Sequence, residues 1–266
     1  MVGGGAAALK VATWNVNSLR VRLDRVCAWL EAQAPDVLCL QELKLAESAF
    51  PVAELEARGY HAAVFGQKTW NGVAILARRP PEDVRRGFSD GPDDGHARLV
   101  SARVDGVRVL SAYFPNGGSV GSEKWAYKLA WMERLRAELE KHYDPGEPLL
   151  VCGDMNVAPD DRDVENPDQW KDTVLCHPDA RAGLARVCEW GLRDTLRLHH
   201  EQGGLYSWWD YQRLAFPRND GLRIDLVLAS APMAARCRAA SIDRNARKGK
   251  QPSDHAPVLA EFAPTP

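Results

Sequence analysis

The stretch LVSARVDGVRVLSAYF, residues 99–114, decides the class of fold. Its two apolar runs flank Asp105 and Gly106, and an Asp-Gly pair between such runs is a strong signal for a tight β-hairpin. A hairpin pairs its strands antiparallel, so the sheet that contains it is not purely parallel. Elsewhere short apolar runs alternate with longer helical stretches, which is typical of α/β proteins. We therefore predict mixed β-sheets that pack as a sandwich flanked by helices.

The other elements follow from the spacing of apolar residues. Short apolar runs predict strands at residues 9–14, 37–40, 73–77, 149–152, 224–228 and 256–262. Apolar stripes predict helices at residues 20–32 and 127–143, and a third at residues 181–190 that Gly191 ends. Because no internal repeat and no Pro-, Gly- or Ser-rich linker divides the chain, we predict a single domain over residues 10–263 after a flexible tail over residues 1–9.

The composition describes an ordinary globular protein. Of 266 residues, 45% are hydrophobic and 26% charged, which allows a sizeable core, and the net charge of −2 leaves room for a local basic face. The six cysteines have no CxxC spacing, and Cys39 and Cys152 lie in apolar runs, so we expect reduced core thiols in a cytoplasmic protein. No apolar run approaches the length of a membrane span, and the N-terminus has no signal-peptide pattern.

Acids and amides gather where the predicted strands begin or end. Six strands carry such groups: Asn15 and Asn17, Gln41 and Glu42, Tyr113 and Asn116, Asp154 and Asn156, Asp225, and Asp254 and His255. Each has an ordinary structural interpretation, such as a turn former, a core aromatic or a structural histidine. All six would have to coincide, however, and active sites commonly form at strand ends.

This set of side chains suits a hard divalent cation. Carboxylate and amide oxygens are ligands for Mg²⁺ or Mn²⁺, whereas a zinc site would need cysteines or clustered histidines. A cation held by carboxylates with His and Asn donors nearby is typical of phosphoryl-transfer chemistry.

Seven motifs in order give the chain a specific resemblance. They are WNVNS (14–18), LQELK (40–44), YFPNG (113–117), GDMN (153–156), WWDY (208–211), RIDL (223–226) and SDHAPV (253–258). The set resembles the exonuclease III family of abasic-site (AP) endonucleases, within the endonuclease/exonuclease/phosphatase superfamily, from about residue 10 to residue 262. One departure is Leu43, where many members carry Thr, a position that does not itself bind metal.

The resemblance implies a fold and a set of roles. The fold is a four-layer α/β sandwich of the DNase I type: two mixed sheets face to face, with helices outside. Glu42 would be the principal Mg²⁺ ligand, Mn²⁺ being an alternative, in a set that includes Asn15, Asn17, Asp254, Asp154 and Asn156. Asp154 would orient or deprotonate the attacking water, and Asn156 would donate to the scissile phosphate. His255 would stabilise the phosphate charge, oriented by Asp225, while Tyr113 and Asn116 would contact phosphate oxygens.

The resemblance also implies a substrate. The enzyme would hydrolyse the phosphodiester 5′ to abasic sites in double-stranded DNA during base excision repair, as a nucleoid-associated monomer that does not bind membranes. It would also trim and clean 3′ ends. Trp208, Leu222 and Ile224 would form the pocket for the abasic sugar, because a snug apolar pocket excludes an intact nucleotide. Arg213 and Arg218, on a loop with Leu214 and Phe216, would enter the minor groove.

The basic run at residues 244–250, with Lys68, Lys124 and Lys128, is a candidate phosphate-binding track. Adjacent residues entering a strand face opposite ways, so Asp225 rather than Asp254 should partner His255.

Two alternatives to a DNA repair nuclease stay open. One is a phosphoinositide or sphingomyelin phosphodiesterase or phosphatase of the same fold, and the other is a non-catalytic DNA-binding scaffold.

Overall fold

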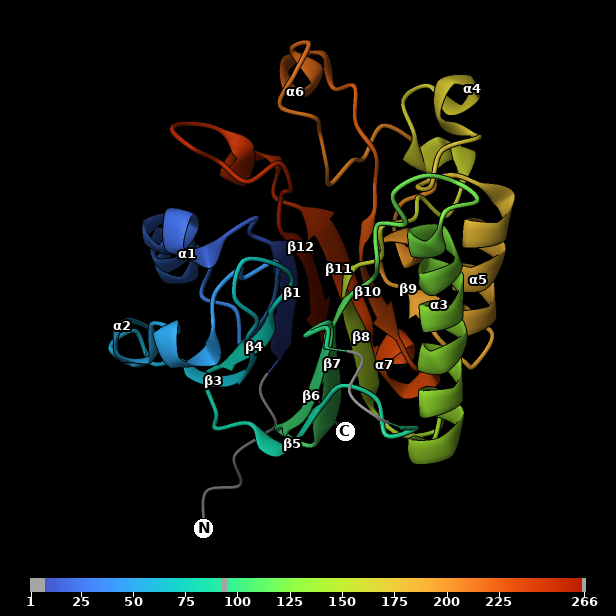
Figure 1. Ribbon diagram of the computed structural model, residues 1–266. Helices are drawn as coiled ribbons and strands as arrows, with labels where there is room; N and C mark the ends of the chain where they lie inside the picture. The colour runs from blue at the N-terminus through green and yellow to red at the C-terminus, as the bar shows by residue number, and fades with distance from the viewer. Residues whose placement is uncertain (1–7, 92–94, 265–266) are drawn as a thin grey trace.

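Two six-stranded mixed sheets form the centre of the molecule (Figure 1). The structure is a computed structural model that describes residues 8–91 and 95–264. The predicted tail lies outside the described residues except at its end, where the first strand already begins at Leu9. The sheets pack face to face with helices on their outer sides, so the predicted four-layer sandwich is confirmed.

The first sheet contains both ends of the described chain. Its strand order is β11 (Cys237–Ile242), β12 (Val258–Phe262), β1 (Leu9–Asn15), β2 (Val37–Gln41), β4 (Val73–Ala77) and β3 (His61–Phe65). Strand β1 runs parallel to β2 and antiparallel to β12. The carboxyl ends of β1 and β2 and the start of β12 therefore lie at the same end of the sheet.

The second sheet contains the predicted hairpin. Its order is β5 (Glu82–Arg86), β6 (Leu99–Val104), β7 (Val107–Tyr113), β8 (Leu149–Asp154), β10 (Asp225–Ala229) and β9 (Arg193–Asp194). Strands β6 and β7 pair antiparallel around Asp105 and Gly106, whose φ angles of 48° and 79° are the left-handed values that a tight hairpin turn requires. Strand β7 runs parallel to β8, and β10 runs antiparallel to it.

Alternating side chains fill the layers on both sides of each sheet. In β2, Val37 and Cys39 pack between the two sheets, whereas Leu38 and Leu40 face the helices. In β8, Leu150 and the thiol of Cys152 also face the space between the sheets. All six cysteines are free in the structure, and five of them are buried.

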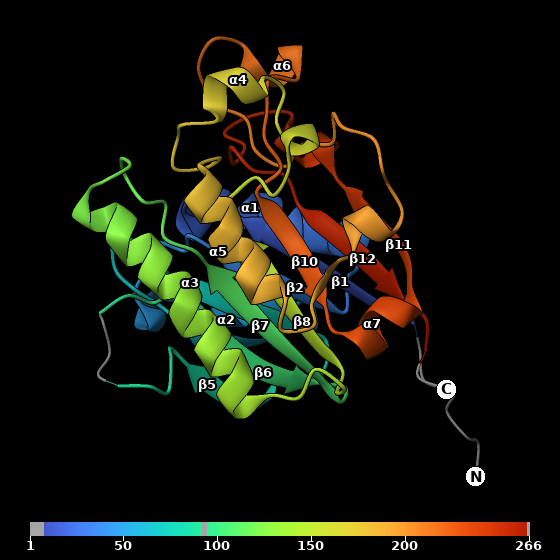
Figure 2. The ribbon, with the colours of Figure 1, turned by 90° about the vertical axis from the view of Figure 1, so that its right-hand side faces the viewer.

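The helices cover the two outer faces. Helices α1 (Leu19–Gln33) and α2 (Val52–Glu56) cover the first sheet, and α3 (Glu123–His142) and α5 (Pro178–Cys188) lie side by side over the second (Figures 1 and 2). Helix α3 begins four residues before its predicted start, because Ser122 caps it by accepting a hydrogen bond from the Trp125 N–H. The short helices are α4 (Pro167–Trp170), α6 (Ala215–Arg218) and α7 (Ala231–Arg236). Among the described helices, none has the length and apolarity needed to cross a membrane.

Four of the strands were not predicted: β3, β5, β9 and β11. They are the edge strands of the two sheets. Edge strands carry more polar and exposed side chains than central ones. Strand β5, for example, reads Glu-Asp-Val-Arg-Arg and keeps all of its charged side chains in solvent.

Candidate active site

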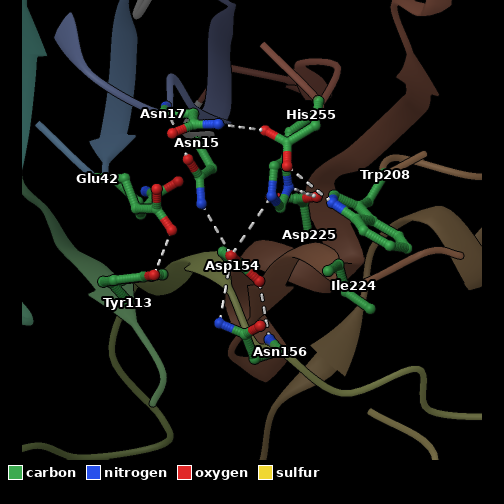
Figure 3. A network of polar contacts seen from close by, with 12 residues as sticks. Asn15, Asn17, Glu42, Tyr113, Asp154, Asn156, Trp208, Ile224, Asp225 and His255 are labelled. Carbon is green, nitrogen blue, oxygen red and sulfur yellow. Dashed lines mark hydrogen bonds and ion pairs between the residues drawn. The ribbon is translucent and has the colours of Figure 1, made fainter. Parts of the chain in front are cut away.

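The predicted site residues meet at one end of the sandwich (Figure 3). Strands β1, β2, β7 and β8 end there, and β10 and β12 begin there. The register aligns Tyr113, Asp154 and Asp225 side by side across β7, β8 and β10. The topology thus brings together residues that lie up to 240 positions apart in the sequence.

His255 is paired with Asp225 in the centre of the site. Its Nδ1 atom lies 2.8 Å from Asp225 Oδ2, and its Nε2 atom lies 3.8 Å from Asp154 Oδ2. Ser207 supports the pair, because its hydroxyl donates to Asp225 Oδ2 at 2.6 Å and accepts from the Asp225 N–H at 3.0 Å. The partner of the imidazole is therefore the distant aspartate rather than the neighbouring Asp254.

Burial and charge shift the protonation of this cluster. Burial raises the pKa of Asp154 to about 7, even though the His255 imidazole opposes this. Burial also disfavours a charged imidazole, but the carboxylates of Asp225 and Asp154 outweigh it and raise the pKa of His255 to about 10. The imidazole is thus held in its charged form, with a buried acid of nearly neutral pKa beside it.

Asp154 is held by amide groups. Asn15 Nδ2 donates to Asp154 Oδ2 at 2.9 Å, and the backbone N–H of Asn156 donates to Asp154 Oδ1 at 2.8 Å. The Asn156 side chain donates to the Phe114 carbonyl at 2.9 Å and accepts from Asn116 Nδ2 at 3.2 Å. We call Asp154, Asn156, Asp225 and His255 the inner half of the site.

The remaining polar side chains form an outer half, made of Asn17, Glu42, Lys44 and Asp254. Lys44 Nζ lies 3.0 Å from Glu42 Oε2 and donates to Asn17 Oδ1 at 2.6 Å. Asn17 Nδ2 in turn donates to Asp254 Oδ1 at 3.0 Å. The Tyr113 hydroxyl donates to Glu42 Oε1 and links the two sheets across the site.

Two pKa shifts keep Asp254 of the outer half and the neighbouring Tyr113 in defined protonation states. Burial, helped by the charges of Glu42 and Asp154, raises the pKa of Tyr113 well above its usual value, so that Tyr113 remains a hydrogen-bond donor. Although burial opposes it, the His255 charge and the hydrogen bond from Trp208 lower the pKa of Asp254. The Trp208 Nε1 atom donates to Asp254 Oδ2 at 3.0 Å.

Four site residues have a left-handed backbone conformation. The φ angles of Asn17, Glu42, Lys44 and Asn156 are 43°, 53°, 53° and 48°. Asparagine tolerates this region, but for glutamate it is uncommon and costs on the order of 1–3 kcal/mol. Such strain is found at functional sites, where the surrounding structure holds a side chain in a required direction.

The donor set of the outer half fits a hard cation. Carboxylate and amide oxygens of Glu42 and Asn17 already converge on one positive charge, the ammonium of Lys44. The inner half offers a second set: ligand atoms of Asp154, Asp225 and His255 lie within 4.8 Å of one another, and Asp225 Oδ1 is buried without a hydrogen-bond partner among the described residues. Of the six predicted metal ligands, Glu42, Asn17 and Asp254 thus lie in the outer half. Asp154 lies in the inner half, where Asn15 and Asn156 hold it by hydrogen bonds.

The residues predicted to receive an abasic sugar lie beside His255. Trp208 forms β-bridges with Leu222 and with His255, so the three are adjacent. Leu222 and Ile224 are 0% and 2% exposed, so Trp208 alone offers surface there. The Trp208 ring also meets the edge of Trp170 from α4, with ring centroids 5.9 Å apart.

The loop predicted to enter the minor groove projects from this end of the molecule. Arg213 and Arg218 are exposed, and Leu214 is 71% exposed. Phe216 lies under the loop, where the guanidinium groups of Arg244 and Arg247 stack on it at 4.2 and 5.1 Å from the ring centre.

The proposed phosphate-binding track needs correction at several positions. Arg247 is buried and Arg244 donates to the Phe216 carbonyl at 2.6 Å, so both support the loop rather than face solvent. Lys128 is 0% exposed, and only Lys68 and Lys124 of the three lysines are on the surface. The sequence feature that indicates the burial of Lys128 is its place on the apolar stripe of α3, three residues after Trp125 and four before Met132.

Two residues that support the site were not predicted from the sequence. Lys44 stands within the LQELK motif, but no role was assigned to it. Ser207 precedes the tryptophan pair, and nothing in the sequence links it to Asp225, which lies 18 residues away.

A cavity extends from the outer half on the side away from Trp208. Its volume is about 470 Å³, and it runs from Glu42 and Tyr113 to the exposed ring of Trp70. Basic side chains line it, among them Lys124 and Arg98. A cavity with basic side chains in its lining therefore adjoins the outer half of the site.

A sandwich of this kind, with a His–Asp pair and convergent carboxylates at one end, defines a phosphoesterase. Comparison with known proteins gives the family. Residues 12–255 match the endonuclease/exonuclease/phosphatase family. The chain is 38% identical to exodeoxyribonuclease III of Haemophilus influenzae over 96% of this chain and all of the relative. It is 33% identical to the DNA repair nuclease APEX1 of Danio rerio over 98% of this chain and 84% of that one.

Solved structures agree. An AP endonuclease from Archaeoglobus fulgidus superposes with a TM-score of 0.93 at 43% identity, covering 96% of this chain and 99% of that one. A 3′ phosphatase, NExo from Neisseria bound to a product DNA hairpin, superposes with a TM-score of 0.90 at 42% identity over 96% and 99% of the two chains. The chain belongs to the endonuclease/exonuclease/phosphatase family and, within it, to the exonuclease III group of AP endonucleases. It is a DNA repair nuclease, a hydrolase that acts on DNA.

Proposed function

We propose that this protein is a Mg²⁺-dependent class II AP endonuclease. It hydrolyses the phosphodiester 5′ to an abasic site in double-stranded DNA and leaves a 3′-hydroxyl and a 5′-deoxyribose phosphate. Removal of nucleotides and blocking groups from 3′ ends is its secondary activity. It acts as a monomer on cytoplasmic, nucleoid-associated DNA.

The observation that carries the proposal is the position of the inner half between two different binding surfaces. On one side Trp208 stands beside His255, next to the exposed loop that carries Leu214. On the other side the cavity of about 470 Å³ leads to Trp70. A strand whose scissile phosphate lies over Asp154 and His255 extends its abasic sugar toward Trp208 and its upstream nucleotide toward Trp70.

The inner half performs the displacement at phosphorus. Asp154 orients the attacking water and accepts its proton, a task for which a pKa of about 7 is well matched. The charged imidazole of His255 faces the phosphate oxygens through Nε2, because Nδ1 is held by Asp225. Fixed donors of this kind stabilise the charge that develops on the phosphate without reorganisation.

Amide and phenol groups complete the phosphate site. Asn156 and Asn116, which contact each other at 3.2 Å, donate to the non-bridging oxygens. Tyr113 contributes its hydroxyl, which its raised pKa keeps protonated.

The outer half holds the metal. Glu42, Asn17 and Asp254 supply hard oxygen ligands of the kind that Mg²⁺ prefers, and Mn²⁺ accepts the same set. When bound, the cation neutralises phosphate charge and lowers the barrier to displacement. Lys44 occupies the same group of oxygens and balances the Glu42 charge.

A duplex with one tetrahydrofuran abasic analogue tests the proposal. With Mg²⁺ we expect a single incision 5′ to the analogue, abolished by EDTA, and weak incision of the matched intact duplex. The same duplex with a recessed 3′ end measures the exonuclease activity. Intact substrate after incubation with Mg²⁺ or Mn²⁺ would contradict the abasic specificity.

The same assay separates the alternatives. Inositol phosphate and sphingomyelin serve as control substrates, and hydrolysis of either without incision of DNA would favour the lipid-directed enzymes of this fold. Tight binding of the duplex without hydrolysis would favour a non-catalytic scaffold.

A further inference from the structure

Lys128 is the most deeply buried cation near the site, and no step of the proposed mechanism uses it. It lies on the buried face of α3, and its side chain is 0% exposed. Its Nζ atom donates to three backbone carbonyls, those of Asn156 and Val174 at 2.6 Å and that of Asn116 at 3.1 Å. All three protons of the ammonium are thereby used.

The three carbonyls belong to three separate loops. Asn116 follows β7, Asn156 follows β8, and Val174 lies between α4 and α5. The loop after β7 also packs on the stem of the lysine: a Cβ atom at Gly117 would lie 2.9 Å from Lys128 Cδ. One side chain thus fastens these loops to α3 from behind the site.

A buried ammonium with only neutral partners is an expensive way to fasten loops. Desolvation of a charge is costly unless strong hydrogen bonds offset it. The effect is visible in the pKa of Lys128, which burial lowers to about 7 although the charge of Asp154 opposes this. An apolar residue on this buried helix face would avoid the cost, so the arrangement calls for a role that packing alone does not supply.

The loops that Lys128 fastens carry two of the phosphate-binding amides. The Asn116 and Asn156 side chains contact each other at 3.2 Å, and the Asn156 N–H holds Asp154 at 2.8 Å. Asn156 also has a left-handed φ of 48°, which its surroundings must hold in place. A shift of either carbonyl would move both amides relative to Asp154.

We propose that Lys128 is a positioning residue of the phosphodiester hydrolysis, which aims the amides of Asn116 and Asn156 by holding their backbone carbonyls from behind. The inference rests on the proposed function, because it assigns these amides to the scissile phosphate. Lys128 itself touches neither water nor substrate.

The test compares Lys128→Met, which keeps the stem and removes the donors, with Lys128→Arg, which keeps the charge and the donors. Displacement of a catalytic group by about 1 Å costs on the order of 100-fold in rate. On the tetrahydrofuran duplex we expect kcat of Lys128→Met to fall by about 10- to 100-fold with KM changed less than about threefold, and Lys128→Arg to recover most of the loss. In combination with Asn116→Ala, the two losses should be less than multiplicative.

Met132→Ala is the matched control for lost stability. Met132 lies on the same buried face of α3, is 0% exposed, and packs against Gly183 of α5. We expect it to lower the melting temperature as much as Lys128→Met and to leave kcat within about twofold. A Lys128→Met enzyme with kcat within twofold of wild type, or with a loss no larger than that of Met132→Ala, would overturn the proposal. If Lys128→Met does not fold, Lys128→Gln replaces it.

Hydrogen–deuterium exchange separates a failure of this inference from a failure of the proposed function. Segments 114–118 and 154–158 should exchange faster in Lys128→Met than in wild type, with or without DNA. Unchanged exchange there overturns the positioning role even if the enzyme incises abasic DNA. If the wild-type enzyme does not incise abasic DNA, the proposed function fails, and the exchange data still decide whether Lys128 holds the loops.

Discussion

The inner and outer halves of the site are held in different ways. Asp225, Asp154 and His255 are 0%, 1% and 5% exposed, and each has its partner in another buried side chain or a backbone group. In the outer half, Lys44 and Glu42 retain 30% and 18% of their side-chain exposure. Their contacts run through long side chains that have other rotamers available.

The difference fits the two tasks that we propose for the halves. Groups that stabilise developing charge work best when they are fixed in advance in a dry environment. Groups that must admit a cation and a DNA strand need to rearrange. Asp254 and His255 illustrate the division, because adjacent residues serve opposite halves.

The inner half should be the more sensitive to a single substitution. We expect His255→Ala to lower the single-turnover rate of incision by about 10³-fold, because the variant loses both the fixed charge and its hydrogen bonds. His200→Ala is the control, since His200 contacts the Ala240 carbonyl away from the site. A His255→Ala rate above a tenth of wild type would contradict the assignment.

A change in the outer half should act first on the metal requirement. Glu42→Gln removes the carboxylate that pairs with Lys44, so we expect the Mg²⁺ concentration for half-maximal incision to rise about 10- to 100-fold. Glu47→Gln, at an exposed partner of Arg86, should leave it unchanged. The measurement is a Mg²⁺ titration of both variants, and identical curves would exclude Glu42 as the principal ligand.

Loss of Lys44 should lower the Mg²⁺ requirement, and by less than loss of the Glu42 carboxylate raises it. The ammonium competes with a cation for the oxygens of Glu42 and Asn17, and a partly exposed ion pair contributes at most about 1 kcal/mol, or about fivefold in affinity. Lys44→Met should therefore need up to about fivefold less Mg²⁺ for the same upward shift in melting temperature. Weaker metal binding by this variant would mean that Lys44 organises the ligands instead.

The subtlest difference between the halves is their response to pH. The pKa values of Asp154 and His255 are raised, to about 7 and about 10, so the folded protein binds these protons more tightly than the unfolded chain. The stabilising contribution of Asp154 is complete below about pH 3.8 and is lost as the pH rises to about 7. That of His255 is complete below about pH 6.5 and is lost toward about pH 10.

Urea unfolding between pH 7 and 9 measures this effect. Lys128 contributes the opposite slope over this range, because burial lowers its pKa to about 7, so the test lies in the difference between variants. With rising pH, the free energy of unfolding of His255→Asn should fall less steeply, or rise more steeply, than that of wild type and His200→Ala. Equal slopes in all three proteins would contradict the raised pKa of His255.

The central strands of both sheets could be predicted from the sequence, but the edge strands could not. The eight predicted strands, such as β4 at residues 73–77, are central and buried on both faces, so their side chains are almost all apolar. The four missed strands are edges, where solvent replaces a neighbour and polar residues such as those of β5 are accepted. A short apolar run therefore identifies a strand that has a neighbouring strand on each side, but it does not identify a strand at the edge of a sheet.

The site residues could be named from the sequence because their motifs carry chemistry, but their division into halves could not. That Asn15 holds Asp154 depends on the distance between β1 and β8, which lie in different sheets. The burial of Lys128 and Arg247 depends on which loops cover them. A lysine or arginine in a sequence looks the same whether it binds DNA or fastens a loop.

The pairing of β1 with β12 has a consequence for biosynthesis. Strand β12 lies between β11 and β1, and the Trp14 indole donates to the His255 carbonyl at 3.1 Å across 241 positions of sequence. Strand β1 therefore leaves the ribosome long before β12, and its sheet is complete only after β12 has been made. A nascent chain that has reached residue 250 holds Asn15, Glu42 and Asp154 but neither Asp254 nor His255. On the roles that we propose for these two residues, nuclease activity begins only when this last pairing closes.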